Sequence, residues 1–285
     1  MTLNFKMDNL LLLAINASLK AGKAILKHYQ SSYSIEYKSD ASPLTSADKE
    51  AHEIITEGLM ESRLPVLSEE GKLLPYEIRK SWQLFWLVDP LDGTKEFISG
   101  NGEFTVNIAL IENNAPIMGV VYLPVTGMLY FGSQEHGSYR VHITDKKENL
   151  YTNLHSIISA SEKLPTHTNR PVTIIGSRSH QNEKTASLIN SLIGKFESVD
   201  IVNAGSSLKF CRIAEGSADI YPRLGPTMEW DTAAGHAVCK FAGVKVLKYE
   251  SDEELSYNKE DLLNPYFIAV AEKYFTFVIN CNKTL

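Results

Sequence analysis

The N-terminal part of the chain shows apolar positions at two different spacings. From Asp8 to Tyr29 they recur every three or four residues, which predicts an amphipathic helix with a packing role. A looser alternation over Ser31–Lys38 predicts a short strand, and the polar segment that ends at Pro43 interrupts it. Thr45 then begins a second predicted helix, which extends to about Arg63.

The central part of the chain is dominated by strand-like runs. Leu84–Val88 is apolar and bulky, as a buried strand should be, and we expect it to stop at Asp89-Pro90 because proline cannot continue the ladder. Before it, Val66–Gly71 predicts a short strand that runs into adjacent acids, and Leu73–Trp82 is predicted to be a polar insert. Later runs predict an antiparallel meander and one further strand, namely Phe104–Leu110, Pro116–Leu123, Gly127–Gly132 and Ser138–Ile143.

Strands and helices alternate in the second half, which indicates an α/β architecture. The polar run 144–149 predicts a boundary between two domains, residues 1–150 and 151–285. The predicted strands are Val172–Ile175, Val199–Val202, Ala218–Tyr221, Lys245–Leu247 and Pro265–Val270. The predicted helices are Glu183–Phe196, Leu208–Glu215 and Thr232–Phe241, and the pattern assigns no element to the tail 272–285.

Composition restricts the classes of function. The 285 residues are 44% hydrophobic and 22% charged, as in an ordinary globular protein. A net charge of -6 argues against binding of long nucleic acid, whereas a small phosphorylated ligand is compatible because bound cations reverse the local sign. Three cysteines with neither metal-ligand nor disulfide-framework spacing predict reduced, mostly buried thiols in a cytoplasmic protein.

The apolar run Leu10–Ile15 near the N-terminus is interrupted by Asn16, Ser18 and Lys20. We therefore expect it to fall well short of a transmembrane segment, and no cleavage site for a signal peptide follows it. Loose attachment to the inner face of the cell membrane stays open, and the sequence indicates no oligomeric state.

The segment after the central strand carries candidate chemistry. Asp89, the Leu91 carbonyl and Asp92 offer three hard oxygen donors within a short stretch. Gly93 leaves room beside them, and a helix that begins at Thr94 would point its unpaired first amides at the same place. Oxygen ligands beside an anion-binding helix start indicate a magnesium-assisted phosphate site. Taken alone, Asp-Pro and Asp-Gly are also common turn dipeptides, with Asp92 as an N-cap.

Other acids have both a structural and a chemical interpretation. Asp231 precedes a helix of small residues and is a suitable N-cap for it. Asp48 stands three residues after Thr45, which predicts a capping box. Glu69 and Glu70 are adjacent, like many solvated surface charges.

Together, Trp86–Phe97 and Glu229–Gly235 resemble the two signature motifs of the lithium-sensitive, magnesium-dependent phosphomonoesterases. This superfamily comprises inositol monophosphatases, fructose-1,6-bisphosphatases and 3'(2'),5'-bisphosphate nucleotidases, and the resemblance extends from about Pro43 to Val246. It implies a layered αβαβα sandwich, with an α+β metal-binding part followed by an α/β substrate-binding part. It also implies two magnesium ions as cofactor, with a third, weaker ion left open.

The resemblance further implies a role for each acid. Asp48 and Thr94 would orient the attacking water with help from Glu69, and the amides of Gly93 and Thr94 would receive a phosphate oxygen. No phosphoenzyme is expected, because no side chain acts as the nucleophile. The implied metal ligands are Glu69, Asp89, the Leu91 carbonyl, Asp92 and Asp231, with Asp89 shared between the ions.

Two segments of the second half carry anion-binding groups of their own. Gly176–His180 follows a predicted strand and combines backbone amides, hydroxyls and positive charge, although a lone histidine such as His180 is as often structural. In Gly205–Lys209, Ser206 and Lys209 lie one turn apart beside free amides. The alternative there is a Gly-Ser cap with a solvated lysine.

A third segment, Tyr221–Pro226, predicts a rigid loop that brings Arg223 in front of Asp231. A monophosphatase needs cations only at the reacting phosphate, so additional anion-binding groups indicate a second phosphate on the substrate. The three segments resemble those of bacterial 3'(2'),5'-bisphosphate nucleotidases of the CysQ type. This implies hydrolysis of adenosine 3',5'-bisphosphate to AMP, with the sulfated analogue as a further candidate. The family's nucleotide-binding positions fall on Ser177, His180, Ser206, Lys209 and Arg223.

Two other functions stay open. An inositol monophosphatase or another sugar phosphatase would use the same metals without depending on Lys209 or Arg223. A non-catalytic ligand-binding protein on this fold would have lost a metal ligand or the water-orienting pair, whereas the acids and Asp48 with Thr94 are present in this sequence.

Overall fold

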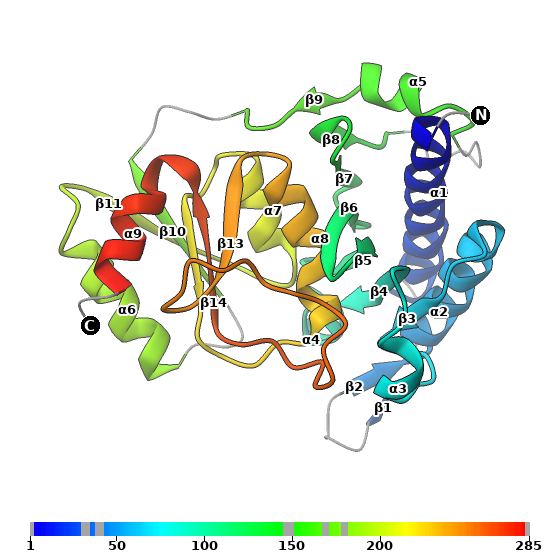
Figure 1. The fold of residues 1–285 in the computed structure, drawn as a ribbon, viewed down its shortest axis with the longest axis horizontal. Coiled ribbons are helices and arrows are strands. Elements are labelled where there is room, and N and C mark those ends of the chain that lie inside the picture. The colour runs from blue at the N-terminus through cyan, green and yellow to red at the C-terminus, as the bar shows by residue number, and fades with distance from the viewer. Residues whose placement is uncertain are drawn as a thin grey trace.

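In the computed structural model of this chain, helices and sheets alternate in five layers (Figure 1). The structure describes residues 3–29, 35–37, 43–144, 151–166, 171–177 and 182–282. An outer layer of helices covers a seven-stranded sheet, a middle layer lies between this sheet and a five-stranded one, and a second outer layer covers the far face. The predicted αβαβα sandwich is confirmed.

The first outer layer consists of α1 (Leu3–Tyr29) and α2 (Ser46–Leu59), which pack on each other and on the seven-stranded sheet. By length and composition alone, the stretch Met7–Tyr29 would suffice to cross a membrane. This match is a weak indication, because 56% of its apolar 18-residue window is buried inside the protein, as in the core helix of a packed domain.

The seven-stranded sheet has the order β3-β4-β5-β6-β7-β8-β9. β3 runs parallel to β4, and the other neighbours are antiparallel, so the predicted meander is confirmed. The strands are β3 (Val66–Ser68), β4 (Leu84–Asp92), β5 (Thr105–Glu112), β6 (Ala115–Leu123), β7 (Met128–Ser133), β8 (Gly137–His142) and β9 (Glu162–Lys163).

The central strand β4 differs from its prediction at its C-terminal end. It does not stop at Asp89-Pro90 but continues to Asp92, and its register with β5 shifts between Asp89 and Asp92. Pro90 lies within this irregular stretch, where a missing backbone donor is tolerated. Before the irregularity, alternate side chains such as Phe85 face the middle layer, whereas Trp86 faces α1 and α2.

The second half forms the middle layer, the five-stranded sheet and the far outer layer. The sheet has the order β11-β10-β12-β14-β13 and mixes parallel and antiparallel pairs. Its strands are β10 (Val172–Ser177), β11 (Val199–Ala204), β12 (Ile220–Arg223), β13 (Val244–Lys248) and β14 (Phe267–Ala271). The helices are α7 (Leu208–Ala214) and α8 (Glu229–Lys240) in the middle layer, and α6 (Glu183–Ile193) and α9 (Phe275–Asn282) outside.

Several boundaries differ from the sequence predictions. Helix α8 begins at Glu229, ahead of the predicted Thr232, and Arg223 belongs to strand β12 rather than to a loop. The expected polar insert contains a helical turn. The helix predicted to begin at Thr94 is confirmed as α4 (Thr94–Ser99). Elements found beyond the predicted set, or shorter than predicted, are β1 (Ile35–Tyr37), β2 (Pro43–Thr45), η1 (Met60–Ser62), α3 (Tyr76–Arg79), α5 (Leu154–Ser159), β9, η2 (Glu272–Tyr274) and α9.

The division at residues 150 and 151 stays a prediction, because most of the proposed boundary lies outside the described residues.

A buried acid, Glu215, fastens α7 to the seven-stranded sheet. Its carboxylate accepts hydrogen bonds of 2.7 Å from Tyr130 on β7, Arg140 on β8, Arg212 on α7 and the nearby Ser217. Burial raises the pKa of Glu215, but the hydrogen bonds outweigh it and the net pKa is lowered.

We expect Glu215→Gln to lower the free energy of unfolding by about 2–4 kcal/mol, because it removes the buried charge to which Tyr130, Arg140 and Arg212 all donate. A carboxyl whose pKa is lowered on folding contributes stability above its unfolded pKa of about 4.5, and the contribution is lost as the pH falls through the folded pKa. The difference between the two proteins in urea should therefore shrink in acid. Glu162→Gln is the matched control, since Glu162 pairs with the same Arg140 but is exposed; an equal loss in both variants would contradict the prediction.

Candidate functional site

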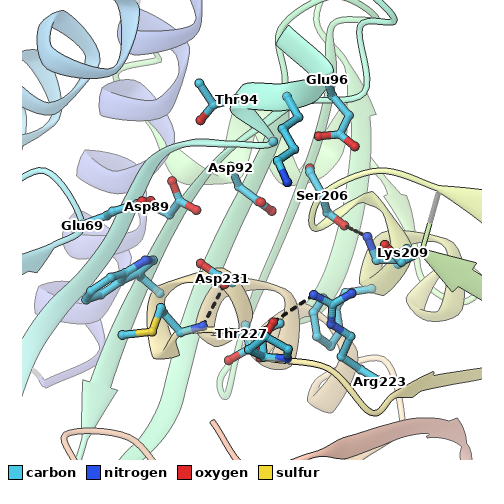
Figure 2. A pocket seen from close by; sticks show the side chains of 18 of the residues that line it. Glu69, Asp89, Asp92, Thr94, Glu96, Ser206, Lys209, Arg223, Thr227 and Asp231 are labelled. Atoms are coloured by element: carbon cyan, nitrogen blue, oxygen red, sulfur yellow. Dashed lines mark hydrogen bonds between the residues drawn. The ribbon is translucent and has the colours of Figure 1, made fainter. Parts of the chain in front are cut away.

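A cavity of about 350 Å³ lies where the C-terminal end of β4 meets the first residues of α4, α7 and α8 (Figure 2). The C-terminal ends of β10 and β12 complete its wall. Glu69, Asp89, Asp92 and Asp231 lie on one side of it, and Lys209 and Arg223 lie across from them.

The strand pairing places two of these acids side by side. β3 and β4 are parallel, with Ser68 opposite Val88, so Glu69 and Asp89 follow at the same level. The Glu69 amide donates to the Val88 carbonyl at 3.1 Å and holds this arrangement. Asp231 arrives from the first turn of α8, where its Oδ2 accepts the Met228 amide at 2.8 Å. Carboxylate oxygens of Glu69, Asp89 and Asp231 all lie within 4.8 Å of one another.

Asp92, the fourth acid, is held by three residues that the sequence analysis did not single out. Its Oδ2 accepts the Ser207 amide at 2.7 Å, the Asn107 amide group at 3.3 Å and the Thr105 hydroxyl at 3.5 Å. The Ser207 hydroxyl in turn donates to the Asp231 carbonyl at 2.9 Å. Ser207 therefore joins two of the acids, and its place directly after Ser206, ahead of a helix, was the signal available in the sequence.

The acids destabilise one another's charged forms. Burial raises the pKa of Asp89 well above its usual value, and the charges of Glu69, Asp92 and Asp231 raise it further. Burial likewise raises the pKa of Asp231, with Asp92 and Glu69 adding to the effect. A divalent cation would remove this repulsion, and a set made only of carboxylates fits magnesium, which prefers oxygen ligands. The buried Leu91 lines the same cavity, next to Asp92.

Asp48 both caps a helix and contacts Thr94, the two roles considered for it from the sequence. Its Oδ2 accepts the Thr45 amide at 2.8 Å and the Thr45 hydroxyl at 2.5 Å, which completes the predicted capping box. Its Oδ1 accepts the Thr94 hydroxyl at 3.4 Å. The cap thus fixes a side chain that also reaches the start of α4, where Thr94 lines the cavity.

Gly93 allows the turn between β4 and α4. Its φ of 91° lies in the left-handed region, and an added Cβ would stand 3.1 Å from the Ser206 Cβ and 3.2 Å from the Glu96 carboxylate. Ser206 itself has φ 45°, and its hydroxyl lies 2.9 Å from that of Thr105. The two predicted phosphate-binding turns therefore touch each other.

The two predicted substrate-binding cations are buried rather than solvated. Lys209 Nζ donates to the Ser206 carbonyl at 2.6 Å and the Ala204 carbonyl at 3.4 Å. Burial lowers the pKa of Lys209 to about 8, although Asp92 opposes this shift. Arg223 donates to the Pro226 carbonyl at 2.9 Å, while its Nε has no partner in the described part of the chain. A solvated lysine at the cap, the alternative drawn from the sequence, is therefore wrong.

Of the two remaining residues predicted to bind substrate, one lines the cavity and the other lies outside the described part of the chain. Ser177, at the end of β10, is buried and lines the cavity, whereas His180 lies outside the described residues. Cavity-lining residues that the sequence analysis did not select include Lys95, Glu96, Tyr221, Thr227, Met228 and Trp230.

A carboxylate cluster at the end of a sheet strand, inside a five-layered sandwich, defines a protein of the inositol monophosphatase class. The chain belongs to the inositol monophosphatase family, whose model matches residues 6–279.

Within this family the chain is similar to proteins named CysQ. The 3'(2'),5'-bisphosphate nucleotidase CysQ of Salmonella typhimurium is 43% identical over 252 residues, which cover 87% of this chain and 94% of that protein. The crystal structure of CysQ from Bacteroides thetaiotaomicron is 48% identical, with a TM-score of 0.87 over 93% of this chain and 98% of that one. An inositol monophosphatase from Thermotoga maritima covers 95% of both chains at 19% identity and a TM-score of 0.71, which shows the shared fold alone.

We expect Gly93→Ala to destabilise the protein by about 1 kcal/mol more than Gly100→Ala in chemical denaturation. Both positions have φ in the left-handed region, so both substitutions introduce the same type of backbone strain. At Gly100, however, the nearest atom to the new Cβ is the Tyr29 hydroxyl at 3.9 Å, so only the Gly93 variant forces two segments apart. Equal losses for the two variants would show that the contact with Ser206 carries no energy.

Proposed function

We propose that this protein is a magnesium-dependent phosphomonoesterase that hydrolyses the 3'-phosphate of adenosine 3',5'-bisphosphate to AMP and phosphate. The observation that supports this most is one cavity with four converging carboxylates on one side and two buried cations on the other. The carboxylates suit a metal-bound phosphate, and the cations suit a second anion on the same substrate. The relatives named 3'(2'),5'-bisphosphate nucleotidase, at 42–43% identity over most of the chain, support the same substrate.

The metal ligands in this proposal are Glu69, Asp89 and the Leu91 carbonyl for one ion, and Asp89, Asp92 and Asp231 for a second, with a third left open. When bound, magnesium supplies the positive charge that activates water and stabilises the leaving oxygen.

The remaining groups bind and orient. Thr94, held by Asp48, positions the attacking water, and the amides of Gly93 and Thr94 receive a phosphate oxygen. The remote phosphate is bound by Arg223 and by the start of α7, which contributes Ser206 and Lys209. Ser177 and His180 complete this part of the binding site. Hydrolysis of the sulfated analogue is part of the same proposal.

We place the protein in the cytoplasm, where buried free thiols such as Cys211 and Cys239 remain reduced.

The metal site can be tested without turnover. In the metal-free protein, Asp89 and Asp231 have raised pKa values. A carboxyl whose pKa rises on folding stabilises the folded state at low pH, and this contribution is lost as the pH rises through the folded pKa. We therefore expect magnesium to raise Tm by an amount that grows as the pH rises above about 4, because the ion removes the repulsion between the ionised acids.

Asp231→Asn should reduce the magnesium-induced rise in Tm, because one of the two proposed ions loses a ligand. The metal-free protein should remain at least as stable as the wild type, because one repelling charge is gone. The matched control is Asp219→Asn, which removes a buried carboxylate bonded to the Thr173 amide at 2.9 Å, outside the cavity. This control should lose stability but keep the magnesium response. An unchanged magnesium response in Asp231→Asn would contradict the ligand assignment.

The substrate is tested by comparing catalytic efficiency on adenosine 3',5'-bisphosphate and inositol 1-phosphate. We expect a preference for the nucleotide of at least about tenfold, equivalent to 1.4 kcal/mol of transition-state binding. A preference for the inositol ester would keep the metal chemistry and overturn the substrate assignment.

Arg223→Met adds a test of the remote phosphate. It should lower kcat/KM for the bisphosphate by at least about tenfold and leave adenosine 3'-monophosphate nearly unchanged, because only the bisphosphate carries the second anion. Arg63→Met, at an exposed arginine outside the cavity, is the control and should affect neither substrate.

A further inference from the structure

Thr227 lines the cavity, but the function proposed above gives it no part. It belongs to the short segment that connects β12 to α8. Directly before it, the Pro226 carbonyl accepts a hydrogen bond of 2.9 Å from Arg223. Directly after it, the Met228 amide donates to the Asp231 carboxylate at 2.8 Å. Thr227 therefore lies between the proposed remote-phosphate cation and the acidic cluster, as Figure 2 shows.

Asn264, a buried residue outside the cavity, holds this segment in place. Its backbone amide donates to the Thr227 carbonyl at 2.8 Å, and its side-chain nitrogen donates to the Met228 carbonyl at 2.7 Å. The same nitrogen also donates to the Thr227 hydroxyl oxygen at 3.3 Å. Because an amide nitrogen can only donate, the Thr227 hydroxyl is the acceptor in this bond and keeps its own hydrogen for another partner.

The Thr227 hydroxyl differs in this respect from that of Thr232, the other hydroxyl bonded to Asn264. The Thr232 hydroxyl accepts from Asn264 at 3.0 Å and donates to the Glu229 carbonyl at 3.2 Å. Within the described part of the chain, the Thr227 hydroxyl accepts from Asn264 but has no acceptor for its own hydrogen. Thr227 is half-buried in the cavity wall, so a bound substrate can supply that acceptor.

The position of Thr227 indicates which part of the substrate it can meet. In the proposed binding mode, the reacting 3'-phosphate lies at the acids and the remote 5'-phosphate lies at Arg223. The ribose joins the two phosphates, so it passes along the wall where Thr227 lies. With both phosphates in place, the ribose of adenosine 3',5'-bisphosphate has a single free hydroxyl, at the 2' position. That hydroxyl oxygen is an acceptor that suits the unused hydrogen of Thr227.

We propose that the Thr227 hydroxyl donates a hydrogen bond to the sugar hydroxyl next to the reacting phosphate, so that the site selects ribonucleotides over deoxyribonucleotides. This inference rests on the function proposed above and adds a specificity-determining contact to it. The sugar hydroxyl takes no part in the reaction, so the contact is equally strong in the bound ester and in the transition state. It therefore lowers KM and leaves kcat unchanged.

The test compares adenosine 3',5'-bisphosphate with its 2'-deoxy analogue. We expect the wild type to have an about tenfold higher kcat/KM on the ribonucleotide, the scale of one hydrogen bond. Thr227→Val keeps the shape of the side chain and removes the hydroxyl, while Asn264 retains its acceptors at Met228 and Thr232. This variant should raise KM for the ribonucleotide about tenfold and change the deoxy analogue less than about twofold, which abolishes the preference.

Two further variants separate a substrate contact from a structural one. Thr227→Ser retains the hydroxyl and should retain most of the preference. Thr232→Val removes the other hydroxyl bonded to Asn264, and it should lower Tm without changing the ratio of the two efficiencies.

A wild type that does not distinguish the two nucleotides would overturn the inference while the proposed function stands. The same holds if Thr227→Val loses equally on both substrates or keeps the preference. Release of phosphate from neither nucleotide by the wild type would overturn the proposed function and this inference with it.

Discussion

The site depends on holding like charges together in the wall of a cavity. Carboxylate oxygens of Glu69, Asp89 and Asp231 lie within 4.8 Å of one another, and both burial and the neighbouring charges oppose the ionisation of Asp89 and Asp231. Isolated side chains would separate to relieve this. Glu69 and Asp89 are held in place by the parallel pairing of β3 with β4, and Asp231 by the start of α8. The neighbouring Asp92 is held by the amide of Ser207, which directly precedes α7.

The start of α8 is braced by the loop that contains Asn258 and Lys259. Glu229, two residues before Asp231, accepts the amides of Asn258 and Lys259 at 2.6 and 2.9 Å. The buried Arg79 holds the same loop, since its guanidinium donates to the Asn258 side chain at 3.0 Å and to the Glu260 carbonyl at 2.7 Å. Arg79 belongs to α3, which follows β3 and precedes β4 along the chain; Glu69 and Asp89 are in or next to these two strands. The segment expected to be a mere polar insert thus connects both halves of the acidic cluster.

The sequence could predict those parts of the site whose signal is local. Asp89 and Asp92 follow a strand recognisable from its apolar composition, and the Thr45–Asp48 cap is set by a spacing of three residues. Signals that need tertiary structure were out of reach. Pro90 was expected to end β4, but a register shift accommodates it, and only the pairing with β5 shows this. Asn107 supports Asp92 from the neighbouring strand β5, and Ser207 supports it from a helix start more than a hundred residues later. Only the folded chain shows that the two residues meet at Asp92. The sequence left a solvated Lys209 open as an alternative to an anion-binding one, because its burial depends on how α7 packs between the two sheets.

The acids are contributed by distant parts of the chain, so the ribosome synthesises them at different times. Glu69 and Asp89 belong to the first sheet, whereas Asp231 arrives on α8, whose sequence is synthesised much later. During translation the early acids emerge without their partner, so a nascent chain lacks the full cage and gains high affinity for a divalent ion only after the middle layer has docked. With the ligand set proposed above, ion capture would mark the end of folding rather than its beginning, and a chelator would slow the final docking step far less than it weakens the finished protein.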